Sequence, residues 1–336
     1  MKTFMREEKL MDKHLIRTTT ATLVAISILC ASAIAGAATF PERPVRIVVA
    51  SAPGGGTDII ARLLAHKLLD IWKITAIVDN RSGGGGQIAT DIVAKATPDG
   101  YTLLLQGNGI SYTPYLYKKL SFDVKRDIVA VTMVGSQPFI LAVHPSVPAK
   151  SVAELVQLAK AKPGELRFSS GGIGGSSHLG TELFRFRAGV NMLHVPYKGT
   201  GPGVTAMLNG EVHLGIAGVG TILPHAKSGK LRALAVTGAQ RSPAAPELPT
   251  IAENGLPGYA YDVWYGLFAP ANTPRDTLNR INAAANEALR DPETIKRYAA
   301  VGVDVMGGSV EESNRYLQSE MANWEKVIRE AGIQAN

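Results

Sequence analysis

The sequence contains one cysteine, Cys30, in 336 residues, and aromatic residues make up only 6% of it. A single cysteine excludes an internal disulfide framework. The scarcity of aromatic side chains disfavours a platform for stacking the bases of single-stranded nucleic acid. The net charge is +7, but lysine and arginine are dispersed among acidic residues. This pattern indicates a mildly basic surface, with no block that would bind nucleic acid or a membrane.

Several motifs of enzymes and cofactor sites are also missing. The only Gly-Lys pair, Gly229-Lys230, is followed by Leu231, which excludes a phosphate-binding P-loop. No G-x-G-x-x-G opens a helix, no G-x-S-x-G elbow occurs, and the seven histidines form no metal-ligand spacing. We therefore expect no cofactor and no metal. What is abundant is glycine, with 35 residues, and apolar residues, at 46%. This composition excludes disorder and suits buried parallel strands.

The N-terminal segment has the pattern of a secretory signal peptide. Five basic residues lie within residues 1–19, and residues 21–38 then run without a charge to a small-residue end. Ala35-Gly36-Ala37 fits the A-x-A cleavage pattern, so we expect removal of residues 1–37, Cys30 included, and a periplasmic mature chain. Cleavage after Ala35 and initiation at Met11 are the alternatives. The apolar run is also about long enough to anchor as a helix, although the small-residue exit favours cleavage.

Beyond residue 38, strand patterns alternate with helix patterns. The expected strands are Val45–Ser51, Ile74–Val78, Tyr101–Gln106, Leu166–Ser169, Met192–Val195, Val212–Ala217, Leu231–Thr237 and Asp262–Ala269. Apolar strand material in Val129–Val143 is interrupted by Gly135 and Pro138, which predicts a break. Three helical stretches, 274–290, 292–300 and 310–331, end the chain. Strands separated by helices predict an α/β fold with mainly parallel sheets.

Two similar series of strand, glycine-rich loop and helix predict two lobes. The chain crosses between them at about 138–143 and returns at about 263–270, so we expect lobe I to comprise 38–140 and 265–336, and lobe II to comprise 141–264. Ligands of open α/β sheets bind outside the carboxyl ends of the strands. The two sets of loops therefore predict a ligand-binding cleft between the lobes, with two crossing strands as its hinge.

The glycine-rich loops are the candidate binding elements. Backbone amides exposed by glycine, next to the positive end of a helix, bind carboxylate or phosphate without a basic side chain. The alternative is a tight turn, which explains one glycine better than three. The expected ligand-binding residues are Pro53, Gly54, Gly55, Gly56, Thr57 and Asp58 in the first loop, and Ser170, Gly171, Gly174, Gly175, Ser176 and His178 in the second.

Other candidates have open alternatives. His178 contacts ligand or braces its loop, and Lys198, in the segment Tyr197 to Gly199, faces the cleft or the solvent. Gly107 closes a strand, and the run 83–86 lines the cleft or forms a flexible turn. Ala217 ends an apolar strand. Trp264 and Tyr265 near the hinge either pack, as aromatic residues there usually do, or contact the ligand.

These motifs together resemble a known family. The segments 40–46 (FPERPVR), 53–58 (PGGGTD), 98–105 (PDGYTLLL), 176–179 (SSHL), 194–202 (HVPYKGTGP), 229–243 (GKLRALAVTGAQRSP) and 248–253 (LPTIAE) are similar to the Bug family of extracytoplasmic solute receptors, the TctC-like binding subunits of tripartite tricarboxylate transporters. The resemblance covers residues 40–333. It implies a periplasmic type II "Venus flytrap" receptor in which Gly55, Thr57, Asp58, Ser170, Gly171, Gly174, Ser176 and the Tyr197 to Gly199 segment meet ligand carboxylates.

The resemblance implies a monomeric, non-enzymatic receptor that delivers a small carboxylate to membrane subunits of a transporter. Ile173, where the family often has asparagine, and the apolar segment 215–218 favour a ligand with one carboxylate end and an apolar or aromatic body. A receptor that serves a sensor kinase is one alternative. A hydrolase that uses Ser176 and His178 is another, although no acidic residue that would orient the histidine is evident.

Overall fold

The computed structural model describes residues 40–117, 119–331 and 333. The expected signal peptide with Cys30 and its cleavage sites therefore lie outside the described residues. Within the described part, no helix combines the length and apolar character that crossing a membrane requires.

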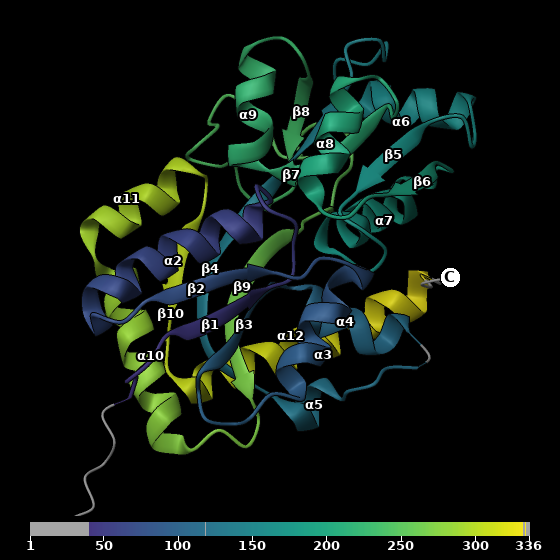
Figure 1. The fold of residues 1–336 in the computed structure, drawn as a ribbon. Coiled ribbons are helices and arrows are strands. Elements are labelled where there is room, and N and C mark those ends of the chain that lie inside the picture. Colours follow the sequence, from purple (N-terminus) through teal and green to yellow (C-terminus); the bar gives the residue numbers. More distant parts are fainter. Residues whose placement is uncertain (1–39, 118, 332, 334–336) are drawn as a thin grey trace, which may run out of the picture. The chain divides into compact units, whose positions relative to one another are not determined.

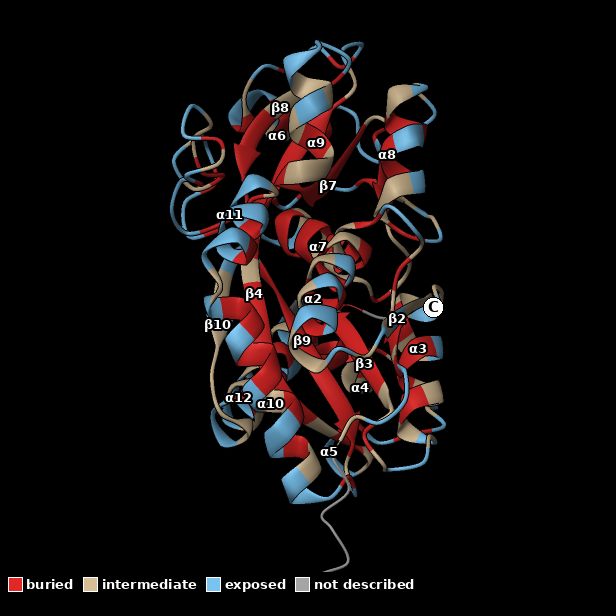
Figure 2. Cartoon of the chain, turned by 60° about the vertical axis from the view of Figure 1, so that its left-hand side comes forward, coloured by how far each residue is buried: buried red, intermediate tan, exposed pale blue. Residues whose placement is uncertain are grey.

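The first parallel block consists of β1 (Val45–Val49), β2 (Ala76–Asn80) and β3 (Thr102–Gly107), with β1 in the middle. The side chains of β1 are almost all buried, as its β-branched sequence predicts. The connections are the helices α2 (Gly56–Trp72) and α3 (Gln87–Ala94), preceded by the short 3-10 turn η1 (Gly84–Gly86). Figure 2 shows the buried strands in red and the exposed outer face of α2 in blue.

The second parallel block consists of β5 (Arg167–Ser170) between β6 (Leu193–Pro196) and β7 (Leu214–Gly218). Its helices are α6 (Val152–Ala161), α7 (Ser176–Ala188), α8 (Thr200–Leu208) and α9 (Val219–Lys227), and β8 (Arg232–Val236) follows them (Figure 1). Ser151 caps α6 by accepting a hydrogen bond from the Glu154 N–H, as its capping-box pattern predicts. The order of strand and helix therefore repeats that of the first block.

Two long antiparallel strands join the blocks. β9 (Asp262–Pro270) pairs with β3 and with the first part of β4 (Ile128–Val143), and the last residues of β4 pair with β7 and β8. The expected break in β4 is wrong, because the strand runs on through Gly135 and Pro138. The ladder absorbs the irregularity as register shifts on either side of Thr132 and Met133.

The C-terminal helices cover this junction. α10 (Arg275–Arg290), α11 (Pro292–Ala300) and α12 (Val310–Ala331) lie where the sequence predicts helices. The sequence did not predict β10 (Asp304–Gly307), which pairs with β4, or the helices α4 (Gly109–Leu116), α5 (Val124–Asp127) and α9. α4 contains Pro114 and begins at a glycine, so its sequence has the composition of a turn.

Trp264 lies in the core beneath α12. Its side chain is 2% exposed, its ring meets that of Tyr316 edge-on, and its Nε1–H donates to a Glu320 carboxylate oxygen at 2.8 Å. The sequence left open whether Trp264 packs or contacts the ligand, and in the structure it packs in the core.

Replacing Trp264 should reduce stability. Trp264→Phe leaves a void and removes the hydrogen bond that Trp264 donates to the half-buried Glu320 carboxylate, so we expect the free energy of unfolding to fall by about 2–3 kcal/mol. Urea unfolding followed by circular dichroism measures the change. Phe186→Leu, at a side chain that is 49% exposed, is the matched control and should change stability by less than about 0.5 kcal/mol. Equal effects of the two changes would contradict a structural role for Trp264.

Candidate ligand-binding site

A cavity of about 70 Å³ lies where loops of both blocks meet. The first block contributes the ends of β1 and β3 and the loop after β2, and the second contributes the loops after β5, β6 and β7. Phe139 of β4 and Val263 and Tyr265 of β9 complete the wall. The carboxyl ends of parallel strands therefore converge on one hollow, which is where an open α/β sheet places its ligand.

In the part of the chain that the structure describes, six helices begin at this cavity without a side-chain cap. These are α2 at Gly56, α3 after Gly86, α4 at Gly109, α7 at Ser176, α8 at Thr200 and α9 after Gly218. Of the helices that begin elsewhere, α5, α6 and α11 are capped by Asp123, Ser151 and Asp291, whereas α10 has no side-chain cap after Pro274. An uncapped helix start presents unpaired N–H groups and about half a positive charge. The cavity is therefore electropositive through backbone groups.

No charged side chain is among the described residues that line the cavity. The polar lining consists of hydroxyl and amide groups, including Ser51, Thr57, Ser82, Gln106 and Ser177. Gln106 is 3% exposed, and the Thr90 hydroxyl lies 2.6 Å from its Oε1. This contact holds the amide of Gln106 so that its NH₂ group remains for a ligand. The site is thus built to donate hydrogen bonds to a small anion.

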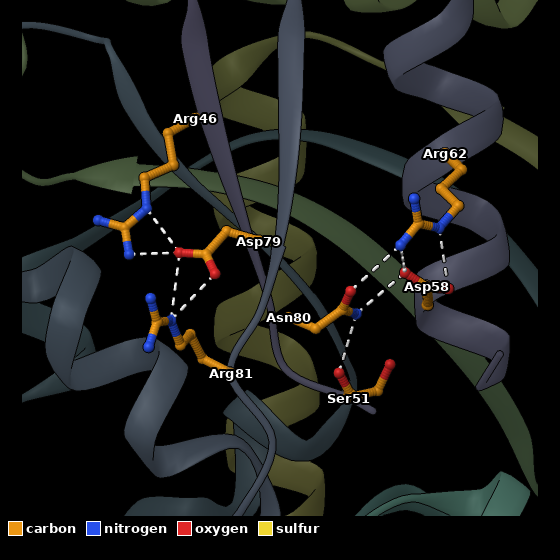
Figure 3. A network of polar contacts seen from close by, with 7 residues as sticks. All are labelled: Arg46, Ser51, Asp58, Arg62, Asp79, Asn80 and Arg81. Carbon is orange, nitrogen blue, oxygen red and sulfur yellow. Dashed lines mark hydrogen bonds and ion pairs between the residues drawn. The ribbon is translucent and has the colours of Figure 1, made fainter. Parts of the chain in front are cut away.

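Asp58 holds the first glycine loop in place. Its carboxylate accepts hydrogen bonds from Asn80 Nδ2 at 2.9 Å and from Arg62 Nε at 3.0 Å (Figure 3). It also accepts one from the Gly54 N–H at 2.9 Å. Burial alone would raise the pKa of Asp58, but the bonds from Arg62, Gly54 and Asn80 outweigh burial and lower it. Asn80 also donates to the Ser51 carbonyl at 3.0 Å, which ties the loop to the end of β1.

The neighbouring strand ends are joined by a second ionic group. Asp79 of β2 accepts hydrogen bonds from Arg46 of β1 and from Arg81, and Figure 3 shows the carboxylate between the two guanidinium groups. The carboxylate is half-buried and both arginines are more exposed. The basic side chains near the first loop are thus directed onto Asp58 and Asp79, which leaves the helix starts to determine the potential inside the cavity.

Two stacked histidines hold the second glycine loop. The rings of His178 and His194 lie 4.2 Å apart, and His178 Nδ1 accepts the Gly174 N–H at 3.2 Å. His194 Nε2 lies 2.5 Å from the Ser170 hydroxyl, which accepts the Gly172 N–H at 3.1 Å. Burial, and after it the neighbouring His194 and Arg185, lower the pKa of His178 to about 3, and burial and Arg185 lower the pKa of His194 to about 4. Both rings are therefore neutral at physiological pH.

Loops of the two blocks are in direct contact beside the cavity. A Cβ added to Gly85 would lie 2.4 Å from the Ile173 carbonyl oxygen, so only glycine allows this approach. The Tyr117 hydroxyl donates to the same oxygen at 2.7 Å. The Ser176 hydroxyl donates to Asn108 Oδ1 at 2.6 Å. These contacts bring the first and second blocks together over the cavity.

The structure brings some of the expected site residues to the cavity and places others behind it. Lining residues are Gly56, Thr57, Gly107, Gly171, Gly175, Ser176 and Gly199. The remaining loop residues do not line it: Pro53 and Gly54 are exposed, Gly55 and Gly174 lie within their loops, and Asp58, Ser170 and His178 hold the loops by hydrogen bonds. For His178 the structure thus displays the bracing arrangement.

Four other candidates outside the two loops lie away from the lining, unlike Gly107 and Gly199. Lys198 is exposed, Tyr197 packs against the core of the second block, and Ala217 is buried in β7. Trp264 points into the core, as described above, because successive side chains of a strand alternate between faces. Its neighbours Val263 and Tyr265 line the cavity instead.

Sequence reasoning missed Gln106, Phe139 and Gly218, favoured packing over ligand contact for Tyr265, and left the turn of Gly83 to Gly86 undecided. Gly83, Gly85 and Gly86 all line the cavity. Gln106 could have been predicted from the sequence, because it is the one polar residue in the run 103–106 and directly precedes the glycine that ends the strand. The place of Tyr265 could not have been predicted, because the sequence does not say which face of β9 is directed to the cavity.

Ser176 and His178 do not form a nucleophile–base pair. Within residues 40–117 and 119–331, the hydroxyl of Ser176 donates to Asn108, and His178 Nδ1 accepts the Gly174 N–H. His178 Nε2 lies 3.7 Å from Glu182. The two side chains serve different contacts, whereas a hydrolase needs the hydroxyl on the imidazole.

The histidine pair predicts acid sensitivity. Because their folded pKa values of about 3 and about 4 lie below the usual 6.5, the unfolded chain binds more protons as pH falls through this range. Stability should therefore decline from about pH 6.5 downward, by up to about 1.4 kcal/mol per pH unit for each histidine. Urea unfolding between pH 7.5 and pH 5 measures the slope, above the usual pKa values of aspartate and glutamate.

His178→Gln retains an acceptor for the Gly174 N–H and removes one titrating ring, so its slope should be shallower. His66→Gln, at an exposed position of α2, is the control and should keep the slope of the unsubstituted protein. An unchanged slope in His178→Gln would mean that other groups cause the acid sensitivity.

Comparison with known proteins places this arrangement in a family. Residues 60–333 match the family described as "Tripartite tricarboxylate transporter family receptor". Protein BugT of Bordetella pertussis is 37% identical over 300 residues, which cover 88% of this chain and 91% of BugT. The structure of R. palustris Rpa4515 with adipate is 38% identical with a TM-score of 0.84, covering 88% of this chain and 99% of that one. The structure of periplasmic binding protein BugD is 32% identical with a TM-score of 0.85, covering 88% and 100%.

These relatives are binding proteins and not enzymes, and the TM-scores show that they share the mainly parallel α/β fold expected from the sequence. The motifs, the fold and the cavity at the carboxyl ends of the strands agree with this relationship. The chain belongs to the receptor family of the tripartite tricarboxylate transporters, and the resemblance to the Bug receptors is confirmed.

Proposed function

We propose that this protein is a periplasmic receptor that captures a small carboxylate in the cavity between its two blocks. The observation that carries the proposal is the convergence of six uncapped helix starts on a cavity lined, among the described residues, by no charged side chain. A carboxylate there would receive amide and hydroxyl donors and the positive ends of helix dipoles. A cationic ligand would meet the same dipoles with the wrong sign.

The relatives support this assignment. The R. palustris protein of 38% identity was solved with adipate, and the protein of 32% identity is named a periplasmic binding protein. A periplasmic location accords with the expected removal of residues 1–37. The lining also includes Phe139 and Val263 beside its donors, which suits the ligand with a carboxylate end and an apolar body that the sequence favours.

The receptor would act as a monomer and deliver its ligand to membrane subunits of a tripartite transporter. Service to a sensor kinase is the alternative, and it uses the same cavity. In both cases the protein must signal that it is loaded, and the proposed means is closure of lobe I (38–140 and 265–336) on lobe II (141–264). β4 and β9 would form the hinge, because they are the strands that pass between the blocks.

Filling the cavity should abolish capture. Gly107 lines the cavity and its φ is not positive, so valine there causes no backbone strain, while its Cβ would lie 3.2 Å from the Ser176 hydroxyl. We expect Gly107→Val to weaken carboxylate binding by about tenfold or more, which corresponds to about 1.4 kcal/mol. Calorimetry against a panel of small mono- and dicarboxylates, adipate included, measures the loss on ligand-stripped protein.

Gly201→Val is the matched control, since Gly201 also has no positive φ and an added Cβ there meets nothing within 4 Å. It should keep the affinity of the unsubstituted protein. The primary amides of the same acids should bind far more weakly than the acids, because they lack the charge that the helix starts stabilise. Tight binding of the amides, or of no acid at all, would contradict the proposed function.

Closure should depend on the contact between Tyr117 and the second glycine loop. Tyr117→Phe removes the 2.7 Å hydrogen bond to the Ile173 carbonyl, so the closed state should be less populated and the carboxylate dissociation constant should rise roughly two- to tenfold. Small-angle scattering should show a smaller radius of gyration with ligand than without it in the unsubstituted protein. Identical scattering profiles with binding confirmed would rule out closure as the response.

A further inference from the structure

Tyr265 and Gln137 form a buried polar pair at the wall of the cavity. Tyr265 of β9 is 2% exposed and lines the cavity, whereas Gln137 of β4 is 3% exposed and lies behind it. Gln137 Nε2 donates to the Tyr265 hydroxyl oxygen at 2.5 Å. A Cβ added to Gly56 would lie 3.3 Å from that oxygen. The hydroxyl group is therefore beside the first residue of α2, where the proposed anion would meet the helix start.

The hydrogen of the Tyr265 hydroxyl has no acceptor among the described residues. A tyrosine hydroxyl has one hydrogen and accepts through its lone pairs. Because Gln137 already donates to the oxygen, the hydrogen is directed away from Gln137, and the cavity is the side that Tyr265 lines. Burial raises the pKa of Tyr265 well above its usual value, so the hydroxyl keeps this hydrogen across the physiological range.

Gln137 itself carries an unsatisfied atom. Its Oε1 is buried and has no hydrogen-bond partner in the part of the chain that the structure describes. Turning the amide over would let Tyr265 donate to Oε1 and would leave the NH₂ group unpaired instead. Both orientations leave one buried polar atom without a partner, so the amide has no strong preference of its own. The group that Tyr265 meets in the cavity therefore decides the orientation.

The amide also has little room to move. A Cβ added to Gly218 would lie 3.0 Å from Gln137 Nε2, and one added to Gly56 would lie 3.7 Å from it. Gln137 thus lies in a slot between the residues where α2 and α9 begin. The small space around it, about 10 Å³, is lined by glycine and aliphatic residues and by Thr221. No charged residue is among those lining positions, so a charge placed at 137 would act on Tyr265 and the cavity.

The titratable neighbours of Gln137 on the adjoining strands face elsewhere. Asp262 pairs with Pro138 and Asp304 pairs with Ser136, so both lie opposite residues adjacent to Gln137 in β4. Since successive residues of a strand point to opposite faces, these carboxylates lie on the other face of the sheet. Burial, with Asp304 second, raises the pKa of Asp262.

We propose that Tyr265 donates its hydroxyl hydrogen to the bound carboxylate, and that Gln137 is the positioning residue that sets the direction of this hydrogen bond. This proposal rests on the proposed function and adds a specificity device to it. A ligand group that accepts hydrogen bonds fixes the amide with Nε2 towards Tyr265. A ligand that carries only donors at this point would require the inverted pair and would bind less well.

The test compares variants of the full mature chain with adipate as the first probe, or with the tightest acid of the carboxylate panel where adipate does not bind. Tyr265→Phe removes the donor and should weaken binding about tenfold or more, since hydrogen bonds to charged groups are among the stronger ones. Tyr298→Phe removes another buried hydroxyl, which donates to the Ile60 carbonyl at 3.1 Å away from the cavity. It is the matched control and should keep the affinity.

Two substitutions of Gln137 distinguish a residue that directs the Tyr265 hydrogen bond from one that only fills the space behind Tyr265. Gln137→Met fills the slot without a polar atom and should weaken binding only a few-fold at every pH. Gln137→Glu has the same shape, but its ionised carboxylate accepts the hydrogen of Tyr265 and repels the ligand. Its affinity relative to the unsubstituted protein should therefore fall as pH rises from about 5.5 to about 8. Measuring both proteins on the same series corrects for the protonation of the acid itself.

The proposal would be overturned if the affinity of Tyr265→Phe for the acid lay within twofold of that of the unsubstituted protein. It would also be overturned if Gln137→Glu and Gln137→Met lost the same affinity at every pH. If the variants at 137 do not fold, Gly218→Ala replaces them. Its Cβ displaces the amide of Gln137 without a positive φ, and it should weaken binding in the unsubstituted protein but not in Tyr265→Phe. Binding of no acid by the unsubstituted protein overturns the proposed function and this assignment with it.

Discussion

The arrangement depends on helix starts that have no side chain to cap them. Capping by serine or aspartate stabilises a helix start by about 1 kcal/mol, and α5, α6 and α11 use it. The six helices around the cavity forgo this stabilisation, and glycine precedes most of them. A bound carboxylate would take the place of the missing caps. The same N–H groups would then provide both affinity and a gain in stability on binding.

Loops made of glycine need support from outside the cavity. Asp58 with Asn80 supports the first loop, and the pair of His178 and His194 supports the second. Both supports lie behind the loops, so their charge or ring does not enter the cavity. Asp58 is held ionised by its donors, whereas burial keeps the histidines neutral. The cavity can therefore remain free of charged side chains while its backbone is held in place.

Much of this could be predicted from the sequence, and the failures have physical reasons. Runs of glycine before a helix pattern can be recognised in the sequence, so Gly56, Thr57, Gly175 and Ser176 were correctly predicted to lie at the cavity. Helix α4 was missed because tertiary packing overrides the turn composition of Gly109 and Pro114. The residue beside the cavity on β9 could not be chosen, because a period of two distinguishes Trp264 from Tyr265 only once one face is known to be the core.

The contacts between the blocks also limit what the cavity can admit. Gly85 lies so close to Ile173 that no side chain fits between them, and the Tyr117 hydroxyl bonds the same carbonyl. A ligand too long for the space beneath these contacts would have to hold them apart, and it would lose their contribution to closure. A ligand that fits would allow the contacts of Gly85 and Tyr117 with Ile173 to form, and these contacts would then stabilise the closed state. Selection by size and selection by charge would thus act in the same closing step, the first through Gly85 and Tyr117 and the second through the helix starts.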